Sequence, residues 1–329
     1  MRIRRKAHGA SFSILCAATV ALLSAPVSAE TLDAAAINGA GIDGGVADGP
    51  TPTMIKLQVL LDRAGISPGV IDGYKGDNVA KALQAFEARE GLEPDGALDE
   101  EVWAILTADG SEVAQTYTIT EDDLSVSFVE PTPQDYKAMS EMERVVYQTP
   151  LEMFAERFHM DQDLLEGLNP EADFGAAGTE ILVVDTGDYL SGTAAQITAD
   201  KTKAALEVYD GEGRLIAFYP ATIGSSETPS PSGDHAVRAV APDAAYYYNP
   251  SVNFKQGDNA EPLEIPPGPN NPVGGIWIDL DKETYGIHGT PDPASVSKTA
   301  SHGCVRLTNW DAAELAGLVS AGVPISFVE

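Results

Sequence analysis

The sequence has few cysteines, few basic residues and no hydrophobic run long enough for a membrane-spanning helix. Two cysteines in 329 residues exclude a disulfide-rich scaffold and a four-cysteine zinc site. Twenty basic residues against 50 acidic ones give a net charge of −30, the wrong sign for binding nucleic acid or an anionic membrane surface. The 43% hydrophobic content is typical of a globular protein, and the length suggests two or more domains.

The N-terminus, residues 1–29, is typical of a secretory signal peptide. Four basic residues near the start precede a 13-residue apolar stretch, Ser11–Leu23, and small side chains occupy positions 27–29. A membrane-spanning helix would need about 20 apolar residues, so a retained anchor is the weaker interpretation. We therefore expect a protein exported to the periplasm, with no integral membrane span after processing.

The rest of the chain divides into four segments that differ in composition and hydrophobic pattern. Residues 30–50, rich in glycine, alanine and aspartate, predict a flexible lead-in. Apolar residues at three- and four-residue spacings, separated by glycine-rich turns, predict a bundle of three short helices over 51–108. Residues 112–188 read as strand, helix, helix and strand, and residues 190–329 as a mainly β domain of short strands. Within that domain, 252–272 reads as a long loop near a functional site.

One group of residues, around His288 and Cys304, indicates a catalytic activity. Removal of the signal would take Cys16 away, and the remaining Cys304 lies 16 residues after His288. A thiol attacks carbonyl groups as the thiolate, and a neighbouring imidazole can take its proton. Backbone N–H groups, such as those of Gly303 and Cys304, can stabilise the resulting oxyanion, and Arg306 adds a fixed positive charge. The pattern favours nucleophilic catalysis by cysteine.

Three other interpretations of the same residues stay open. A lone cysteine is often an inert, buried hydrophobic residue. Two histidines and one cysteine, His288, His302 and Cys304, can bind zinc. Ser301 beside His302 can be half of a serine-based triad.

The motif Tyr285–Thr290, followed by Ser301–Leu307, resembles the signature of the L,D-transpeptidase (YkuD-like) catalytic domain. The similarity extends over about 194–329 and includes Asn271–Gly274 upstream of the motif. One departure is His235, which stands where the family has an aromatic residue, and we expect it to pack rather than to catalyse.

The resemblance implies a role for each residue of the motif. Cys304 would be the nucleophile and His288 its general base, oriented by a backbone carbonyl near Gly289. The N–H groups of Gly303 and Cys304 would form the oxyanion hole. Supporting and substrate-binding roles would fall to His302, Arg306, Tyr285 and Ser301. The implied mechanism requires no metal and no organic cofactor.

The resemblance also implies the reaction. The thiol would attack a wall tetrapeptide and release D-alanine, and an amine would resolve the thioester. An amine on a neighbouring stem peptide gives a 3→3 cross-link, and an amine of an outer-membrane protein or lipoprotein attaches that protein to the wall. Water as acceptor would make the enzyme an L,D-carboxypeptidase or endopeptidase. A non-catalytic wall-binding protein is the alternative from another class, and carbapenems would be inhibitors of the enzyme.

Two further segments resemble wall-binding modules. Residues 51–108 resemble a peptidoglycan-binding module, through Leu57–Leu61, Ile71–Gly76 and Ala82–Phe86. Residues 112–188 are similar to a LysM carbohydrate-binding module, with 125–149 as an insertion before the first helix. The expected fold class is therefore multidomain: a small three-helix bundle, an α+β LysM-like segment and a mainly β L,D-transpeptidase catalytic domain.

Overall fold

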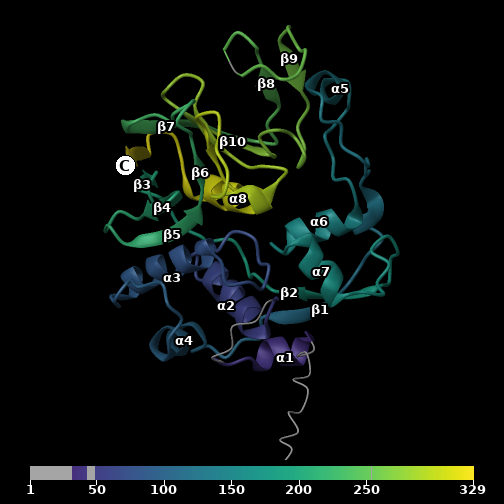
Figure 1. The fold of residues 1–329 in the computed structure, drawn as a ribbon, viewed down its shortest axis with the longest axis vertical. Helices are drawn as coiled ribbons and strands as arrows, with labels where there is room; N and C mark the ends of the chain where they lie inside the picture. The colour runs from purple at the N-terminus through teal and green to yellow at the C-terminus, as the bar shows by residue number, and fades with distance from the viewer. Residues whose placement is uncertain (1–31, 43–48, 253) are drawn as a thin grey trace, which may run out of the picture. The chain divides into compact units, whose positions relative to one another are not determined.

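Helices dominate the first half of the chain and strands the second half (Figure 1). The computed structural model describes residues 32–42, 49–252 and 254–329, so the predicted signal peptide lies outside the described residues. The helices are α1 Ala34–Gly39, α2 Pro52–Arg63, α3 Asp77–Glu90, α4 Glu100–Leu106, α5 Tyr136–Ser140, α6 Pro150–Arg157, α7 Gln162–Leu168 and α8 Asn309–Leu318, with short 3₁₀ turns η1 Asp123–Ser125 and η2 Pro293–Ser295.

The strands are short, as the sequence predicts. They are β1 Ala114–Thr118, β2 Glu180–Val184, β3 Gln196–Asp200, β4 Ala205–Tyr209, β5 Leu215–Pro220, β6 Thr222–Ile223, β7 Gly233–Pro242, β8 Tyr246–Tyr248, β9 Leu263–Ile265, β10 Ile276–Leu280, β11 Gly286–His288, β12 Val305–Arg306 and β13 Pro324–Val328. The segment 252–272, expected as a loop, contains β9, which pairs with β8 in an antiparallel hairpin.

The predicted three-helix region is present as α2, α3 and α4, and its ends follow ordinary capping chemistry. The Thr51 side chain accepts a hydrogen bond from the Met54 amide at the start of α2, and Pro52 occupies the first turn. Asp99 caps α4 in the same way, and Gly91, with a left-handed backbone, ends α3. These local signals are readable in the sequence.

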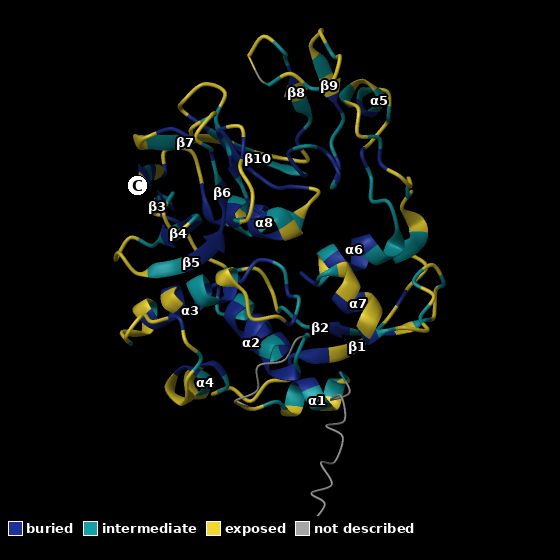
Figure 2. Ribbon diagram, in the orientation of Figure 1, coloured by how far each residue is buried: buried dark blue, intermediate teal, exposed yellow. Residues whose placement is uncertain are grey.

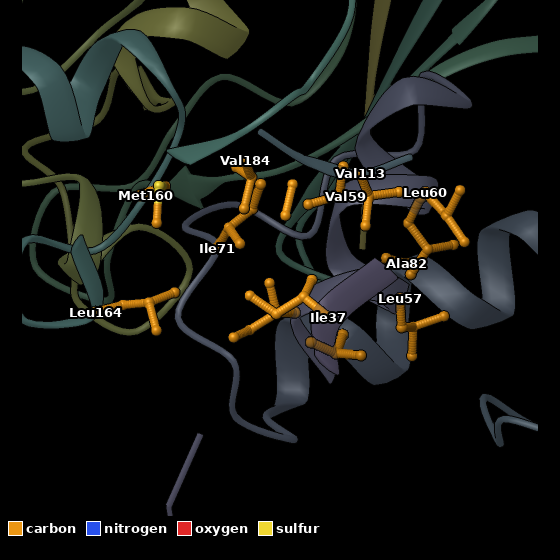
Figure 3. Close-up of a cluster of buried hydrophobic side chains, with 14 of the residues drawn as sticks. Ile37, Leu57, Val59, Leu60, Ile71, Ala82, Val113, Met160, Leu164 and Val184 are labelled. Carbon is orange, nitrogen blue, oxygen red and sulfur yellow. The ribbon is translucent and has the colours of Figure 1, made fainter. Parts of the chain in front are cut away.

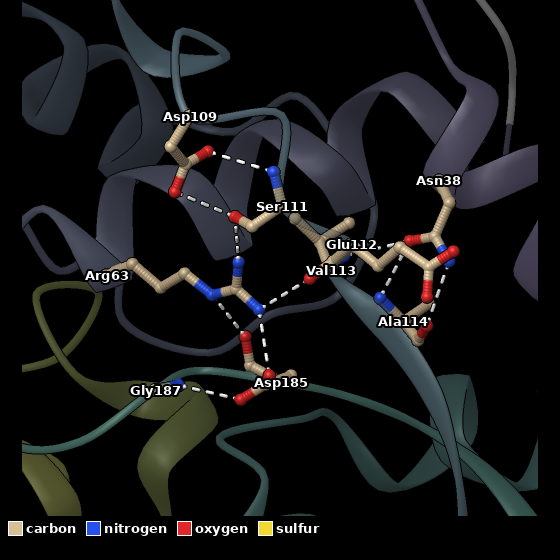
Figure 4. A network of polar contacts seen from close by, with 9 residues as sticks. All are labelled: Asn38, Arg63, Asp109, Ser111, Glu112, Val113, Ala114, Asp185 and Gly187. Carbon is tan, nitrogen blue, oxygen red and sulfur yellow. Dashed lines mark hydrogen bonds and ion pairs between the residues drawn. The ribbon is translucent and has the colours of Figure 1, made fainter.

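The segment 30–50 differs from its prediction as a flexible lead-in. Helix α1 forms within it, and the side chain of Ile37 is fully buried. The Asn38 amide group donates to the Ala114 carbonyl and accepts from the amides of Val113 and Ala114 (Figure 4). The composition argument missed this helix because tertiary contacts, not local propensity, hold it in place.

Residues 112–188 have the expected order of strand, two helices and strand. β1 and β2 pair antiparallel, with Ala114 opposite Val184, and α6 and α7 lie between them in the sequence. The inserted segment, 125–149, leaves this unit and carries α5, which packs against β9 (Figure 1). A part of the LysM-like segment therefore reaches the β domain.

The large sheet holds nine strands among the described residues, in the order β5-β4-β3-β13-β7-β10-β11-β12-β6. Most neighbours are antiparallel, but β13 pairs with β3, and β11 with β12, in parallel. Helix α8 packs against β10 and β11. The sheet thus sets two segments from the predicted motif, β11 and β12, side by side.

One hydrophobic cluster is shared by segments that the sequence divides into modules, while the β domain also has a cluster of its own (Figures 2 and 3). The shared cluster includes Ile37 of α1, Leu57 of α2, Leu164 and Val184 from the LysM-like segment, and Phe218 of β5. Isolated bridges join Ile66 to Phe218 and Ile71 to Met160. The front half of the chain is therefore packed onto the β domain rather than attached to it by a linker.

A polar network joins α2 to the segments that flank β1 and β2 (Figure 4). The Arg63 guanidinium donates to the Asp185 carbonyl at 2.7 Å, to Ser111 Oγ at 2.8 Å and to the Glu112 carbonyl at 2.7 Å. It also forms an ion pair of 3.1 Å with the Asp185 carboxylate. One guanidinium thus satisfies backbone and side-chain acceptors that α4, β1 and β2 leave at their ends.

Buried titratable groups lie where α2, the end of α6 and α8 meet. His159 Nδ1 lies 2.9 Å from Asp62 Oδ2, and the imidazole stacks on Trp310 with ring centroids 5.0 Å apart. Burial alone would lower the pKa of His159, but the Asp62 carboxylate raises it above its ordinary value. Burial, reinforced by the charge of Asp62, raises the pKa of Asp311 to about 8.

This cluster predicts that stability falls with rising pH. An acid with a raised pKa keeps its proton in the folded state after the unfolded chain has lost its own, so stability declines between the two pKa values. The stability from a histidine with a raised pKa is likewise lost above the folded pKa. Between about pH 6 and pH 8, we expect the free energy of unfolding to fall by about 1 to 3 kcal/mol.

Urea unfolding of the wild type and Asp311→Asn across this range measures the effect. The substitution keeps the shape and removes the titration, so it should flatten the profile. Asp258→Asn, at an exposed carboxylate, is the matched control and should leave the slope unchanged. An equal slope in wild type and Asp311→Asn would contradict the assignment.

Candidate active site

The predicted site residues surround one cavity of about 560 Å³ in the β domain. Six of them supply side chains to its lining: Cys304, His288, His302, Arg306, Tyr285 and Ser301. The other two, Gly289 and Gly303, are the chain neighbours of His288 and Cys304. The structure therefore brings all the predicted residues into one place.

The parallel pairing of β11 and β12 sets the geometry. His288 lies opposite Arg306 in the register, and Cys304 directly precedes β12. Side chains two residues apart on an extended chain point to the same face, so Cys304 and Arg306 both face the cavity. Val305, between them, is buried in the core on the opposite face.

His288 is buried and held in one tautomer. Its Nδ1 lies 2.6 Å from the Gly289 carbonyl oxygen, and because a carbonyl only accepts, Nδ1 carries the proton. The imidazole also stacks on Trp277, with centroids 5.7 Å apart. Burial, together with the charge of Arg306, lowers the pKa of His288 to about 4. At neutral pH the ring is therefore neutral, and its Nε2 lone pair can accept a proton.

Cys304 is half-buried and carries its proton at rest. Burial raises the pKa of the thiol, although the Gly286 amide and the Arg306 charge act in the opposite direction. The thiol donates a weak hydrogen bond to the Thr284 carbonyl, with Sγ and oxygen 3.7 Å apart. Within the described residues, no hydrogen bond joins this thiol to His288. A rotation of the cysteine side chain is therefore needed before a proton can pass between them.

Ser301 organises the loop before the cysteine. Its hydroxyl donates to the Cys304 carbonyl at 2.6 Å and accepts from the Gly224 amide at 2.8 Å and from the Gly303 amide at 3.3 Å. Gly303 has a φ of 109°, and a Cβ there would lie 2.8 Å from Tyr285 Cε1. Glycine is thus required at this position by conformation and by space. The serine hydroxyl is fully engaged in the loop, which leaves the serine-triad interpretation without a free nucleophile.

The remaining predicted residues form the walls of the cavity. His302 is exposed and stacks on Phe254, with ring centroids 3.9 Å apart. The Tyr285 hydroxyl donates to the Pro229 carbonyl at 3.4 Å. The Arg306 side chain has no hydrogen bond or ion pair to any residue that the structure describes.

Tyr136 and Asn309 are among the cavity and support residues that the sequence prediction missed. Tyr136, from the inserted segment, lines the cavity. Asn309, at the start of α8, donates to Glu156 Oε2 at 2.9 Å and to the Pro269 carbonyl at 3.1 Å, and its Oδ1 would collide with a Cβ at Gly289. Neither residue has a local signal, because each reaches the site through tertiary packing.

His235, which we expected to pack rather than to catalyse, does not line the cavity. Its Nδ1 is 3.0 Å from Asp281 Oδ1, and its ring contacts Phe327 edge-on. Among the residues that the structure describes, no group of three or more His, Cys, Asp or Glu side chains could hold a metal ion. The zinc interpretation therefore finds no ligand set there.

A thiol, a neutral imidazole and a guanidinium around one cavity are the groups that acyl transfer through a cysteine uses. A family model of the "L,D-transpeptidase catalytic domain" matches residues 194–326. The chain is 30% identical over 183 residues to a Bacillus licheniformis protein named "Putative L,D-transpeptidase YkuD", covering 54% of this chain and 92% of that protein. The chain belongs to the L,D-transpeptidase family.

Other members of the family match this chain over a smaller share of their own length. "Probable L,D-transpeptidase YbiS" of Escherichia coli is 26% identical over 186 residues, covering 55% of this chain and 60% of that protein. A second family model, described as "Putative peptidoglycan binding domain", matches residues 51–106. The resemblance of 112–188 to a LysM module stays a prediction.

Solved structures with similar regions include an L,D-transpeptidase from Mycobacterium smegmatis, 19% identical, covering 48% of this chain and 77% of that chain with a TM-score of 0.35. L,D-transpeptidase 3 from Mycobacterium tuberculosis is 20% identical, covering 45% and 67% with a TM-score of 0.33. Because these scores are low, the family assignment rests on the sequence matches. None of the helices within the described ranges is long and apolar enough to cross a membrane.

The protonation state of the site predicts a pH profile for thiol alkylation. Only the thiolate reacts rapidly with iodoacetamide, and burial raises the pKa of Cys304. We expect the alkylation rate to rise through an inflection above about pH 8.5, the value of a free cysteine. Mass analysis of the labelled protein gives the rate, with Cys304→Ala as the blank. An inflection near pH 6 would instead indicate a resting thiolate–imidazolium pair.

Proposed function

We propose that this protein is a peptidoglycan L,D-transpeptidase in which Cys304 carries the acyl group between a wall tetrapeptide and an amine. The observation that carries the proposal is the cavity in which Cys304, a neutral His288 and an unpaired Arg306 lie together. The family membership of the catalytic region supports the same chemistry.

The proposed first step is attack by sulfur. The thiol turns from the Thr284 carbonyl, His288 Nε2 takes its proton, and Sγ forms a bond to the carbonyl carbon of the third residue of the donor peptide. Each pKa unit that separates a proton donor from its acceptor costs about 1.4 kcal/mol. Since the resting pair is neutral, we expect proton transfer to accompany the attack rather than to precede it.

The oxyanion formed in that step needs donors. The Cys304 and Gly303 amides are the proposed pair, and the left-handed Gly303 backbone turns its N–H toward this loop. The Gly303 amide now donates to Ser301 Oγ at 3.3 Å, a long bond that it can exchange for the stronger acceptor. Collapse of the intermediate breaks the amide bond, and His288 returns its proton to the departing D-alanine amine.

The resulting thioester is resolved by an acceptor amine. Attack of that amine forms the new amide and returns a proton to sulfur through His288. We propose a stem-peptide amine as the acceptor for 3→3 cross-linking, with an outer-membrane protein or lipoprotein amine as a second acceptor class. The predicted signal peptide and the match of residues 51–106 to a peptidoglycan-binding domain support a periplasmic, wall-associated enzyme.

Hydrolysis is the alternative that uses the same thioester. Water in place of the amine would make the protein an L,D-carboxypeptidase or endopeptidase. Incubation with purified tetrapeptide muropeptides, with and without an added amine acceptor, separates these activities by the masses of the products. Dimers that form only with active Cys304 support the transferase, and tripeptides alone support the hydrolase. No product in either reaction would leave a non-catalytic wall-binding protein.

Carbapenem acylation tests the nucleophile. The strained β-lactam carbonyl can occupy the same position as the peptide carbonyl, so we expect one covalent adduct per chain by intact-mass analysis. Cys304→Ala should form none while keeping the far-ultraviolet circular dichroism spectrum of the wild type. An adduct on Cys304→Ala would overturn the assignment of the nucleophile.

The two histidines of the cavity should differ in their contributions. His288 is buried and moves protons, whereas His302 is exposed and stacks on Phe254. Steady-state transfer by His288→Ala should fall about 10² to 10⁴-fold, the usual range for loss of general acid–base catalysis. His302→Ala should lose much less. An inactive His302→Ala beside an active His288→Ala would reverse the two roles.

A further inference from the structure

The inserted segment, 125–149, is bound along its length to the segment that borders the cavity. The Val145 amide donates to the Pro267 carbonyl, and the Val145 carbonyl accepts from the Asn270 amide, both at 3.1 Å. The Gln256 side chain donates to the Gln134 carbonyl at 2.9 Å. The buried side chains of Met139 and Val145 pack with Ile265 of β9. The segment is thus a fixed part of the cavity wall.

Tyr136 begins α5 within this segment, and its ring is held by other aromatic rings. It meets Tyr248 edge-on at a centroid distance of 5.3 Å, Tyr246 at 5.8 Å and Phe254 at 6.1 Å. Edge-on packing on three rings fixes the direction of the phenol. Asp135 caps α5 by accepting from the Ala138 amide at 3.0 Å, which fixes the backbone as well.

Tyr136 carries a phenolic hydroxyl and lines the same cavity as Cys304 and Arg306. Burial raises the pKa of Tyr136 to about 12, and the nearby Arg306 charge opposes that shift, which places the guanidinium within electrostatic reach. In the part of the chain that the structure describes, the hydroxyl makes no hydrogen bond. A tyrosine in such surroundings usually finds an acceptor.

The Arg306 guanidinium likewise lacks an acceptor among the described residues. A guanidinium carries five N–H donors and matches a carboxylate with two parallel hydrogen bonds. It is only partly exposed, yet it forms no ion pair with any acidic residue that the structure describes, although the chain has 50 of them. A half-buried cation and an unpartnered hydroxyl facing one cavity call for an anion that accepts from both.

The spacing fits a carboxylate close to the scissile bond. Cys304 and Arg306 are two positions apart on one face of an extended chain, which corresponds to about 6.6 Å along the strand. In the donor peptide, the residue that follows the attacked carbonyl is the C-terminal one. Its carboxylate therefore lies one residue beyond the scissile bond, and consecutive Cα atoms are about 3.8 Å apart. A donor attacked by Cys304 can therefore present its terminal carboxylate to Arg306.

We propose that the Tyr136 hydroxyl and the Arg306 guanidinium together bind the terminal carboxylate of the donor peptide, which makes Tyr136 a specificity-determining residue supplied by the inserted segment. The inference rests on the proposed function for the identity of the donor. It explains why the insertion extends from the LysM-like segment to the cavity. The insertion completes the binding site for the donor peptide. The Tyr136 hydroxyl adds a hydrogen-bond donor beside the charged Arg306 guanidinium.

Binding without turnover is the first test. In full-length protein carrying Cys304→Ala, calorimetry measures the Kd of a soluble tetrapeptide donor and of the same peptide with its terminal carboxylate amidated. A hydrogen bond to a charged group is worth about 1.5 kcal/mol or more. Tyr136→Phe should therefore weaken binding of the free acid about tenfold. It should leave the weaker binding of the amide unchanged.

Turnover is the second test, in protein with Cys304 intact. Tyr136→Phe keeps the aromatic packing and should raise KM for the free-acid donor about tenfold while kcat stays within about twofold. Tyr247→Phe is the matched control, because Tyr247 lies between Tyr246 and Tyr248, which pack on Tyr136, but is 69% exposed and does not line the cavity. It should behave as the wild type.

The outcomes separate the two proposals. Wild-type Kd and KM in Tyr136→Phe would overturn the role of the hydroxyl and leave Tyr136 as a packing residue. Equal weakening for acid and amide donors would overturn the carboxylate assignment, as would no binding of either peptide. If the acid binds more tightly than the amide through Tyr136, yet the protein with intact Cys304 transfers no acyl group, the proposed function fails while the binding inference stands.

Discussion

The parallel pairing of β11 and β12 is the constraint on which the site depends. The register sets His288 opposite Arg306, and the alternation of side chains turns Cys304 and Arg306 to the cavity while Val305 enters the core. Each strand is only two or three residues long, so the pairing needs support from both sides. β10 flanks β11, β6 flanks β12, and α8 packs against β10 and β11.

That support extends into the front half of the chain. Glu156 of α6 accepts from Asn309, and Asn309 lies directly against Gly289, whose carbonyl holds the His288 proton in place. The shared core and the His159–Trp310 stack add further contacts between the same segments. The front half of the chain and the catalytic domain are therefore a single packed structure, in which the front half supports the backbone at Gly289.

The electrostatics of the cavity contrast with the acidity of the protein. None of the described residues that line the cavity is acidic, although the chain carries a net charge of −30. The lining holds one permanent cation, Arg306, and its charge lowers the pKa of His288 and opposes the rise in the pKa of Cys304. A neutral thiol and a neutral imidazole keep the resting site uncharged except for Arg306, which suits the entry of a peptide that bears carboxylates.

The motif around Cys304 and His288, the family, the helical region 51–108 and the mainly β character of the C-terminal part could all be predicted from the sequence. Capping residues such as Thr51 and Asp99, and the short spacing within Ser301–Arg306, are local signals that act through neighbouring residues.

The contacts that distant segments make with the motif depend on tertiary packing. The flexible lead-in became helix α1 because Ile37 enters a core built from distant segments. Tyr136 of α5 reaches the cavity from far along the chain, and Asn309 of α8 supports Gly289 from outside the motif. Their positions follow from how packed surfaces fit together, and no periodicity or spacing in a single sequence encodes that fit.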